Sequence, residues 1–450
     1  MNGHRPERGN PIREQNPAYG LLQPIFQFKH PRNDSFLLAA GMNSLLNIPV
    51  QIFSAAYSDH VFLVGGYVRD LLLGRQNQDI DMVVALSHGE LSNLGFRLVE
   101  ASSSVNVYCR HHPEFGKIEV TRIDSVADLA IDLTGRDFTI NAMAMDMKGA
   151  LIDPLSGRKD LEAGILRPCS HDSFRNDPLR IIRAFRFEAG GWTMMSETEL
   201  LIREQKWSAS FAAMPVERFS SEMLKALTLQ APERFFQLMI DYQVGKEFLP
   251  ELFLMPAIPA GPLEHHPEGD LFTHSVQVLQ RVARVSSNPL ARFCAFFHDL
   301  GKLGTDPMLH PKHHGHDTLG FSMAAEFCSR LRLPAFYAKA LAWVSRLHGK
   351  ANRWNELRDA TRITMAEQAL KAGVGEILPL ISAADKPGAL QVPEWDKASE
   401  IAGMNTREMG MDQEKLNSMP VEDRQSCILQ RRVELLKRRS NPEQREQLHG

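Results

Sequence analysis

The segment from Val61 to Val84, VFLVGGYVRDLLLGRQNQDIDMVV, constrains the fold of this chain more than any other stretch. Its apolar run ends at Gly65 and Gly66 and is followed by a helical pattern that stops at Gly74, which predicts a strand, a tight turn and a short helix. Because glycine has no Cβ, the backbone N–H groups of such a turn can approach a phosphate closely. The segment therefore predicts a phosphate-binding turn, although a glycine pair after a strand is more often a simple turn.

Two acidic residues open the next predicted strand, which spans residues 79–85. Side chains alternate between the two faces of a strand, so Asp79 and Asp81 are expected to point to the same side. Carboxylates paired in this way can hold two Mg²⁺ ions, which lower the pKa of an attacking hydroxyl and stabilise a leaving phosphate. Arg69, in the predicted helix, can neutralise a triphosphate. Taken alone, such an acidic pair is more often a solvated strand end.

Joined in this order, the glycine turn, the arginine and the acidic pair become specific. The run GGxVRDxLLG…DxD resembles the first motif of the class II tRNA nucleotidyltransferase and bacterial poly(A) polymerase superfamily, and the resemblance extends from about Val61 to the C-terminal helices. It implies an α+β fold: a small mixed β-sheet nucleotidyltransferase head, an all-helical neck and body, and a helical HD domain. The implied catalytic ligands of Mg²⁺ are Asp79 and Asp81, and the implied nucleotide-binding residues include Gly65, Gly66 and Arg69.

The composition narrows the class of protein without identifying it. A length of 450 residues allows roughly two to four domains, and a net charge of −3 gives no global sign of nucleic-acid binding, so contacts with RNA must come from local patches. The five cysteines lack CxxC spacing and no apolar run approaches about 18 residues, which favours a cytoplasmic protein outside the membrane. Residues 1–34 are predicted to be disordered and residues 36–57 to form one or two helices.

A second motif, IDLTGRDFTINAMAMD, spans residues 131–146. Asp137 precedes an apolar helical run, where an aspartate is commonly a helix N-cap. The segment resembles the family's RRDFTINA motif, which binds the incoming nucleotide. The resemblance implies a phosphate or base contact for Arg136, a sugar hydroxyl contact for Asp137, and a position on the same side for Asn141. Gly135 stands where the family usually has its first arginine.

The segment between these two motifs is short. KIEVTR, residues 117–122, is a predicted strand whose Glu119 either completes the metal site or lies on a sheet edge. Only residues 123–135 then remain before Arg136. In most CCA-adding relatives a long flexible loop fills this position and helps the site change from CTP to ATP, and relatives that add only two cytidines lack it. Addition of the terminal A is therefore left open.

The third motif, FRNDPLRIIRAFRFEA, begins at residue 174 with a strong helix start in which Asp177 is the expected cap and a proline follows. Arginines at positions 180, 183 and 186 recur every three residues and form a cationic ridge beside apolar residues that face a core. The family uses the similar motif EDxxR as a protein template. By that resemblance Asp177 and Arg180 read the Watson–Crick edge of the base and Arg183 supports the phosphate or the helix, although Asn176 replaces the glutamate.

Two further segments have structural interpretations. Residues 151–167 resemble the family's next motif and are predicted to form a hinge whose polar residues are structural. Residues 215–227 resemble its last helical motif, in which Glu217, Arg218 and Glu222 are predicted to stabilise the helix as ion pairs rather than to act in catalysis.

Eight histidines lie within residues 263–316. A lone histidine is usually a surface or core residue, but the order His274, His298-Asp299 and Asp385 resembles the HD phosphohydrolase superfamily and the extra domain of the proteobacterial CCA-adding subgroup. These four side chains suit one divalent transition metal, with Ni²⁺ among the candidates. The resemblance implies hydrolysis of phosphate esters, including 2′,3′-cyclic phosphates. A degenerate HD fold without metal is the alternative.

The motifs divide the chain into five segments. The last predicted helix, residues 421–439, is basic and either follows an RNA backbone or is solvated. Four more histidines of this part are candidates for contacts with the metal-ligating side chains or with a phosphate, namely His313, His314, His316 and His348. The predicted boundaries are 1–55 for an N-terminal extension, 56–167 for the nucleotidyltransferase head, 168–262 for the neck and body, 263–390 for the HD domain and 391–450 for a basic helical tail.

The motifs favour a tRNA nucleotidyltransferase that adds C to the tRNA 3′ end without a nucleic-acid template. The same enzyme is expected to add A as well. CTP and ATP are then its substrates, and its HD domain is expected to hydrolyse phosphate esters. The alternatives are an enzyme that adds only the two cytidines, a poly(A) polymerase, a phosphohydrolase whose head merely binds RNA, and an RNA-binding module with an inactive head. The oligomeric state is left open.

Overall fold

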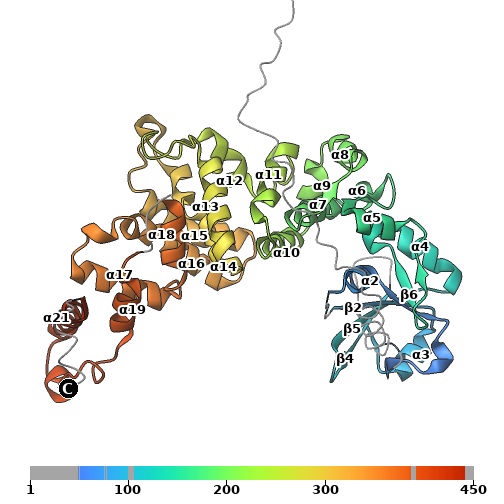
Figure 1. Ribbon diagram of the computed structural model, residues 1–450, viewed down its shortest axis with the longest axis horizontal. Helices are drawn as coiled ribbons and strands as arrows, with labels where there is room; N and C mark the ends of the chain where they lie inside the picture. Colours follow the sequence, from blue (N-terminus) through green and yellow to red (C-terminus); the bar gives the residue numbers. More distant parts are fainter. Residues whose placement is uncertain are drawn as a thin grey trace, which may run out of the picture.

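The computed structural model describes residues 49, 51–75, 77, 79–99, 106–386 and 392–440. These residues form an arch, with a β-sheet head at one end and the C-terminal helices at the other (Figure 1). None of the helices in the described ranges is long and apolar enough to cross a membrane. The predicted disorder of residues 1–34 and much of the predicted helix of residues 36–57 lie outside the described residues, but Ala55–Tyr57 form a short 3₁₀ helix, η1.

The head is built on one mixed β-sheet of seven strands. The strands are β1 (Val61–Val64), β2 (Ile80–Val84), β3 (Arg97–Val99), β4 (Val107–His112), β5 (Gly116–Arg122), β6 (Ala144–Asp146) and β7 (Leu151–Ile152). Their order across the sheet is β3-β4-β5-β2-β1-β6-β7. Strands β2 and β5 are parallel, whereas the other neighbours are antiparallel. The small mixed sheet predicted from the sequence is confirmed.

The centre of the sheet forms from strands that can be buried on both faces. All four residues of β1 are buried, and β2 is buried apart from Asp81, which is partly buried. Helix α2 (Gly65–Leu72) packs against one face, while α4 (Leu129–Thr134) covers the other through a small apolar cluster with β1 and β2. A short helix, α3 (His88–Asn93), follows β2. The strand predicted for residues 79–85 is one residue shorter at each end: Asp79 precedes β2 and Ala85 follows it.

The neck is helical, as predicted, except for one short parallel strand pair, β8 and β9. The elements of the hinge and of the neck and body are α5 (Gly157–Ala163), β8 (Ile165–Leu166), α6 (Ser173–Asn176), α7 (Leu179–Ala189), β9 (Thr193–Met194), α8 (Ser196–Arg203), α9 (Ser208–Ala212), α10 (Val216–Leu227), α11 (Pro232–Tyr242) and α12 (Pro250–Leu254). Helix α7 packs against α10 and α11. Ile181, Ile182 and Phe185 of α7 are fully buried, so the predicted apolar face of this helix is confirmed.

The C-terminal half continues as helices around a phenylalanine-rich core. These helices are α13 (Leu271–Val285), α14 (Pro289–Phe297), α15 (His316–Arg330), α16 (Ala335–Ala351), α17 (Asp359–Ala372), α18 (Ile377–Asp385), α19 (Trp395–Gly403), α20 (Gln413–Asn417) and α21 (Val421–Ser440). Helix α14 is buried over most of its length because Phe293, Phe296 and Phe297 pack on the surrounding helices. This burial places the residues that follow α14 in the interior.

The basic C-terminal helix is more closely integrated than either interpretation of its sequence expected. Arg432 of α21 pairs with Glu367 of α17 at 3.2 Å, and Arg439 pairs with Glu400 of α19 at 2.6 Å. These arginines therefore neutralise carboxylates of the same chain. Lys437 and Arg438 are exposed.

Candidate functional sites

A cavity of about 690 Å³ opens between the head sheet and helix α7. It is lined by residues of all three sequence motifs, although these motifs lie far apart along the chain. All eleven residues predicted for catalysis and nucleotide binding line it, namely Gly65, Gly66, Arg69, Asp79, Asp81, Arg136, Asp137, Asn141, Asp177, Arg180 and Arg183.

The acidic part of this cavity lies at the start of β2. Asp81 is paired in register with Glu119 of the parallel strand β5, so Glu119 lies beside the acidic pair rather than at a sheet edge. Burial raises the pKa of Asp81 although Arg136 opposes it, and the charges of Glu119 and Asp79 add to the increase. Carboxylates that repel one another in this way become more stable when a divalent cation lies between them.

The glycine turn is shaped by its contact with Arg136. Gly65 has a φ of +69°, and a Cβ on this residue would lie 2.6 Å from Arg136 Nη1. The Arg136 guanidinium is itself held by Asp132, whose carboxylate lies 3.0 Å away. Gly65 is therefore required both by the backbone conformation and by the arginine that packs over it.

A chain of charged and amide groups joins three elements across the cavity. Arg69 of α2 donates to Asn141 Oδ1 at 2.8 Å, Asn141 donates to Asp137 Oδ1 at 3.0 Å, and Arg183 of α7 lies 2.9 Å from Asp137 Oδ2. Burial alone would raise the pKa of Asp137, but Arg183 and the hydrogen bonds from Asn141 and Phe138 hold it below its usual value. Asp137 is therefore a buried anion. It is not a helix N-cap, because Phe138 precedes the short 3₁₀ helix.

The two residues expected to read the base are both engaged with the protein. Asp177 Oδ2 accepts a hydrogen bond from Arg218 Nη2 at 2.8 Å, and Asp177 Oδ1 accepts one from the Leu179 N–H at 3.2 Å, so Asp177 caps the start of α7 as predicted. The Arg180 guanidinium donates to the backbone oxygens of Gly135 at 2.7 Å and Arg136 at 3.0 Å. Arg180 of the third motif thus holds the backbone of the second motif in place through these two hydrogen bonds.

Several cavity residues were not singled out from the sequence. Asp132 is one of them, although its spacing of four residues from Arg136 on a helix was an available signal. Phe187 lies under the Arg69 and Arg186 guanidinium groups, at 5.5 and 4.5 Å from ring centre to Cζ. The side-chain contact of Arg186 with Glu222 and that of Arg218 with Asp177 connect different helices. The predicted pairing within α10 is present only for Glu222, which lies 3.9 Å from Lys225. The closer partner of Glu222 and the partner of Arg218 lie on neighbouring elements.

The second candidate site lies in the helical half, where the four predicted HD residues meet. His274 lies on α13, His298 and Asp299 follow α14, and Asp385 ends α18. His274 Nε2 lies 3.0 Å from Asp385 Oδ1, and His298 Nε2 lies 3.3 Å from Asp299 Oδ2. His298 is fully buried, and His274 and Asp299 are 1% and 2% exposed.

The imidazole rings of this site are oriented by hydrogen bonds on their outer nitrogens. His298 Nδ1 donates to the Ala295 carbonyl at 2.9 Å, and His274 Nδ1 donates to Glu268 Oε1 at 2.7 Å. Both Nε2 atoms face the site, and neither has a hydrogen-bond partner among the described residues. Burial alone would lower the pKa of His298, but Asp299 and Asp385 raise it to about 10, so the site favours a positive charge. Buried imidazole nitrogens and carboxylates converging in this way fit a metal ion, which would supply that positive charge in place of a proton.

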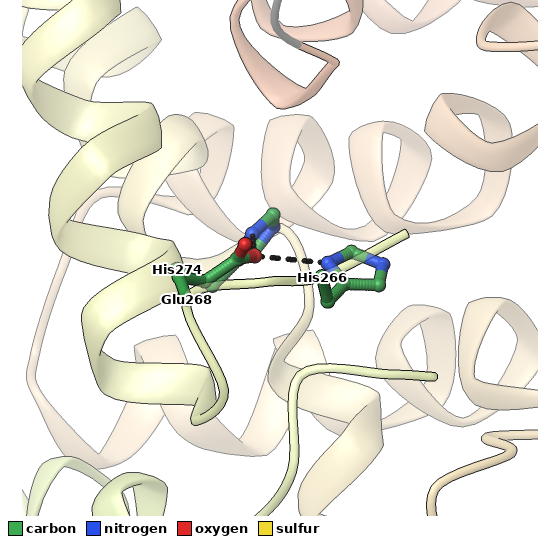
Figure 2. A group of neighbouring side chains, drawn as sticks. All are labelled: His266, Glu268 and His274. Atoms are coloured by element: carbon green, nitrogen blue, oxygen red, sulfur yellow. Dashed lines mark hydrogen bonds and ion pairs between the residues drawn. The ribbon is translucent and has the colours of Figure 1, made fainter. Parts of the chain in front are cut away.

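Glu268 contacts His274 on the side of the ring that faces away from the proposed metal site, and it was not predicted from the sequence. Figure 2 shows its carboxylate between His274 and His266. The same oxygen accepts from His274 Nδ1 at 2.7 Å and from His266 Nδ1 at 2.9 Å. Burial alone would raise the pKa of Glu268, but these hydrogen bonds lower it to about 2. Glu268 thus remains an anion that fixes the His274 ring.

The outer histidines divide into three groups. His316 and His348 reach Asp299 Oδ1, at 3.4 and 3.3 Å from their Nε2 atoms. His313 instead bonds to the Pro259 carbonyl and to Thr305, at 2.7 Å in each case. His314 is exposed.

Comparison with protein families matches three parts of the chain. Residues 61–131 and 104–167 match the poly A polymerase head domain, and residues 191–255 match the probable RNA and SrmB-binding site of polymerase A. Residues 271–373 match the HD domain. The fold and its two sites therefore define a nucleotidyltransferase of the poly(A) polymerase type that also carries an HD domain, and domains of both kinds generally use divalent metals.

Similar proteins give a narrower assignment. The chain is 36% identical over 343 residues to the multifunctional CCA protein of Methylococcus capsulatus, covering 72% of this chain and 80% of that protein. It is also 36% identical to the multifunctional CCA protein of Thioalkalivibrio sulfidiphilus, over 68% of this chain and 78% of that protein. The Thermotoga maritima CCA-adding enzyme complexed with tRNA shares the fold, with a TM-score of 0.59, 21% identity and coverage of 90% of this chain and 97% of that one. The chain belongs to the HD-domain-containing CCA-adding tRNA nucleotidyltransferase family.

Proposed function

We propose that this protein adds C and A to the 3′ end of tRNA, using CTP and ATP and no nucleic-acid template. The observation that carries this proposal is that the acidic pair, the glycine turn and the arginine ridge line one cavity. Relatives are named multifunctional CCA proteins, and solved structures that share the fold are CCA-adding enzymes in complex with tRNA, CTP or ATP.

The acidic pair and the basic residues have separate roles in this proposal. Asp79 and Asp81 hold Mg²⁺, which when bound offsets the charge that develops on the reacting phosphate. The terminal 3′-hydroxyl of the tRNA loses its proton to solvent and attacks the α-phosphate in line. A new P–O bond forms as the bond from the α-phosphorus to the bridging oxygen breaks, and pyrophosphate leaves. Arg69 and Arg136 neutralise the triphosphate, and Gly66 with its neighbour Gly65 lets the phosphates approach the backbone.

Base selection is assigned to helix α7. Asp177 and Arg180 both line the cavity and offer an acceptor and forked donors to the edge of a base. Arg180 also holds the backbone of Gly135 and Arg136, so it connects the base-reading helix to the segment that binds the triphosphate. Arg183 positions Asp137, which is the proposed partner of a sugar hydroxyl.

A single assay tests this function and separates it from its rivals. The protein is incubated with tRNA lacking its 3′ end and with CTP, ATP or both. Addition of C, followed by A only after the two cytidines, is the expected result. Long A tails on generic RNA would identify a poly(A) polymerase instead, and no incorporation of labelled CTP would leave only an RNA-binding or hydrolytic role. If Asp79→Ala left all measurable activity intact, the head would have no catalytic part.

One observation favours a second candidate, an enzyme that adds only the two cytidines. Between β5 and Arg136, the chain has a 3₁₀ turn, Val126–Asp128, followed at once by α4. This compact connection agrees with the short segment expected from the sequence, at the position where most CCA-adding relatives have a long flexible loop. Incorporation of C without A on the same tRNA would support it, and complete CCA synthesis would exclude it.

For the helical half, the proposed activity is hydrolysis of phosphate esters, including 2′,3′-cyclic phosphates. His274, His298, Asp299 and Asp385 hold a divalent transition metal, which supplies a Lewis acid when bound. Imidazole and carboxylate donors suit Mn, Co, Ni or Zn, and Ni²⁺ is the first to test. Metal-dependent release of phosphate from a simple ester measures this activity.

The proposed division of the chain follows the sequence, with a head at 56–167, a neck and body at 168–262, an HD domain at 263–390 and a tail at 391–450. We also assign the protein to the cytoplasm, because all five cysteines are free thiols in the structure. Retention of activity after thorough reduction of the purified protein tests that assignment.

A further inference from the structure

Helix α16 carries a stripe of long cationic and aromatic side chains on its exposed face. These side chains recur at intervals of three and four residues, so they lie on one face of the helix. The α16 stripe consists of Phe336, Lys339, Trp343, Arg346 and Lys350. At a helical rise of about 1.5 Å per residue, the stripe is roughly 21 Å long. It is therefore long enough to contact several units of an extended polymer.

The rest of α16 leaves the stripe open to solvent. The opposite face of the helix is buried, including Tyr337, Leu341 and Val344, and it holds α16 beside α15 (Figure 1). The other residues that are not buried in this helix are alanines and Gly349, which are too small to cover the stripe. Phe336 is 55% exposed. The stripe is thus a surface of the helical half rather than part of its core.

The middle of the stripe is an aromatic platform shared with α15. Trp343 packs edge-to-face against Phe321 of α15, with ring centres 5.4 Å apart and an angle of 87° between the rings. The Arg346 guanidinium lies over Phe321, with Cζ 5.7 Å from the ring centre. Phe321 is 37% exposed, so this platform is accessible from solvent. Aromatic rings and guanidinium planes are the groups on which bases of single-stranded nucleic acids stack.

The positive charge of the stripe is not neutralised by the described part of the chain. Lys339 Nζ donates to the Lys371 carbonyl at 2.7 Å, and Arg346 Nη1 donates to Thr318 Oγ1 at 3.0 Å, so both acceptors are uncharged. Helix α16 contains no aspartate or glutamate. The paired arginines of α21, by contrast, contact carboxylates of the same chain. The stripe therefore presents cations that are available to an external anion.

Single-stranded RNA is the partner that fits both properties of the stripe. Its phosphates complement unpaired cations, and its bases have flat faces that stack on exposed rings. A membrane surface also attracts cations and aromatic rings, but binding to it depends on a broad apolar face. The exposed side of α16 adds only alanines and a glycine to its two aromatic rings, so it lacks such a face.

We propose that the α16 stripe binds single-stranded RNA, with Lys339, Arg346 and Lys350 on the phosphates and a base stacked on Trp343 and Phe321. This inference goes beyond the proposed function, which places RNA only at the cavity of the head. It depends neither on nucleotide addition nor on a metal in the HD domain. The helical half then contributes an RNA contact of its own.

The salt dependence of RNA binding tests the cations of the stripe. The full chain is titrated into a fluorescent oligouridine, and the dissociation constant is measured by anisotropy at several salt concentrations. Each phosphate contact of a single strand contributes about 0.7 to the slope of log affinity against log salt. The triple variant Lys339→Gln, Arg346→Gln, Lys350→Gln should therefore bind more weakly, with a slope smaller in magnitude by about 2.

A second triple variant is the matched control. It replaces three exposed cations of other helices and loops by glutamine, namely Arg284, Arg407 and Lys415. The control loses the same total charge as the stripe variant, so it corrects for long-range electrostatics. Its slope should stay close to that of the wild-type protein. An equal change of slope in the two triple variants would contradict a specific RNA contact at α16.

Substitution of the rings tests stacking separately from charge. Trp343→Ala should weaken oligouridine binding roughly 5- to 100-fold without changing the slope. Because Trp343 is partly buried, thermal unfolding is measured alongside, and the more exposed Phe336→Ala provides a variant that leaves the core intact. Unchanged affinity in Phe336→Ala and in the stripe triple variant would overturn the proposal. So would unchanged RNA binding accompanied by loss of a dimer in sedimentation, or by loss of binding to phosphatidylserine vesicles, which would assign the stripe to a second copy of the chain or to a membrane.

Discussion

Single residues in the head cavity combine steric and electrostatic requirements that are separable by mutation. Gly65 and Gly74 have nearly the same left-handed φ, +69° and +67°, but only Gly65 is covered by another side chain. A Cβ at Gly65 would meet Arg136 Nη1, whereas a Cβ at Gly74 would meet no atom of the described residues within 4 Å. The pair therefore distinguishes backbone strain from displacement of the arginine.

Gly65→Ala is expected to weaken CTP binding as well as the fold. The left-handed conformation costs an alanine about 1–2 kcal/mol of stability, and displacement of Arg136 removes a charge from the triphosphate site. Gly74→Ala should show a similar loss of stability with an unchanged KM for CTP. Thermal unfolding and steady-state kinetics of both variants measure these effects. An equal KM increase in both variants would contradict the proposed role of Arg136.

Glu268 provides a second prediction at the level of one residue. Its carboxylate orients His274, and removal of such an outer partner typically weakens metal binding about 10- to 100-fold. Glu268→Gln keeps the shape but not the charge, so metal affinity should fall by about that factor, as measured by competition with a chelating dye. Glu264→Gln, at an exposed glutamate four residues earlier, should leave the affinity unchanged. Equal affinities in the two variants would show that Glu268 is dispensable.

Secondary-structure elements show where sequence reasoning succeeded and where it stopped. The strand, turn and helix of the first motif and the apolar face of α7 follow from periodicity, because burial imposes a repeat on the local sequence. The contact of Arg180 with the carbonyl of Gly135 joins residues far apart in the sequence, and periodicity carries no information on such pairs. By contrast, the cap predicted at Asp177 is a local interaction, and its carboxylate does accept a hydrogen bond from the Leu179 N–H at the start of α7, at 3.2 Å.

Helix α7 provides the prediction at this scale. Arg180→Lys keeps the positive charge but loses the fork that spans the carbonyls of Gly135 and Arg136. The loss of hydrogen bonds from a charged group should cost about 1.5–3 kcal/mol in stability. We also expect misincorporation of U or G in single-nucleotide assays to rise. Arg175→Lys, an exposed ion pair on α6, should change neither quantity.

The whole molecule combines two sites within one continuous core. Apolar residues from the head sheet to the C-terminal helices belong to a single buried cluster, yet the cavity of the head and the histidine site are lined by separate sets of residues. Because the two sites share no ligand, they can be inactivated separately. Because they share a core, a badly destabilising substitution would affect both.

His298→Ala should therefore abolish metal-dependent hydrolysis of phosphate esters while leaving C addition close to the wild-type rate. The substitution removes a buried ligand, and a large-to-small change in a core typically costs about 2–5 kcal/mol, so thermal unfolding must show that the variant is folded at the assay temperature. Asp79→Asn is the reciprocal variant, which should lose C addition and keep hydrolysis. Chelation followed by Mg²⁺ alone should reproduce the His298→Ala pattern in the wild-type protein, because Mg²⁺ prefers oxygen ligands and binds poorly between imidazoles. If each variant lost both activities although still folded, the head and the HD domain would have to act as one catalytic unit.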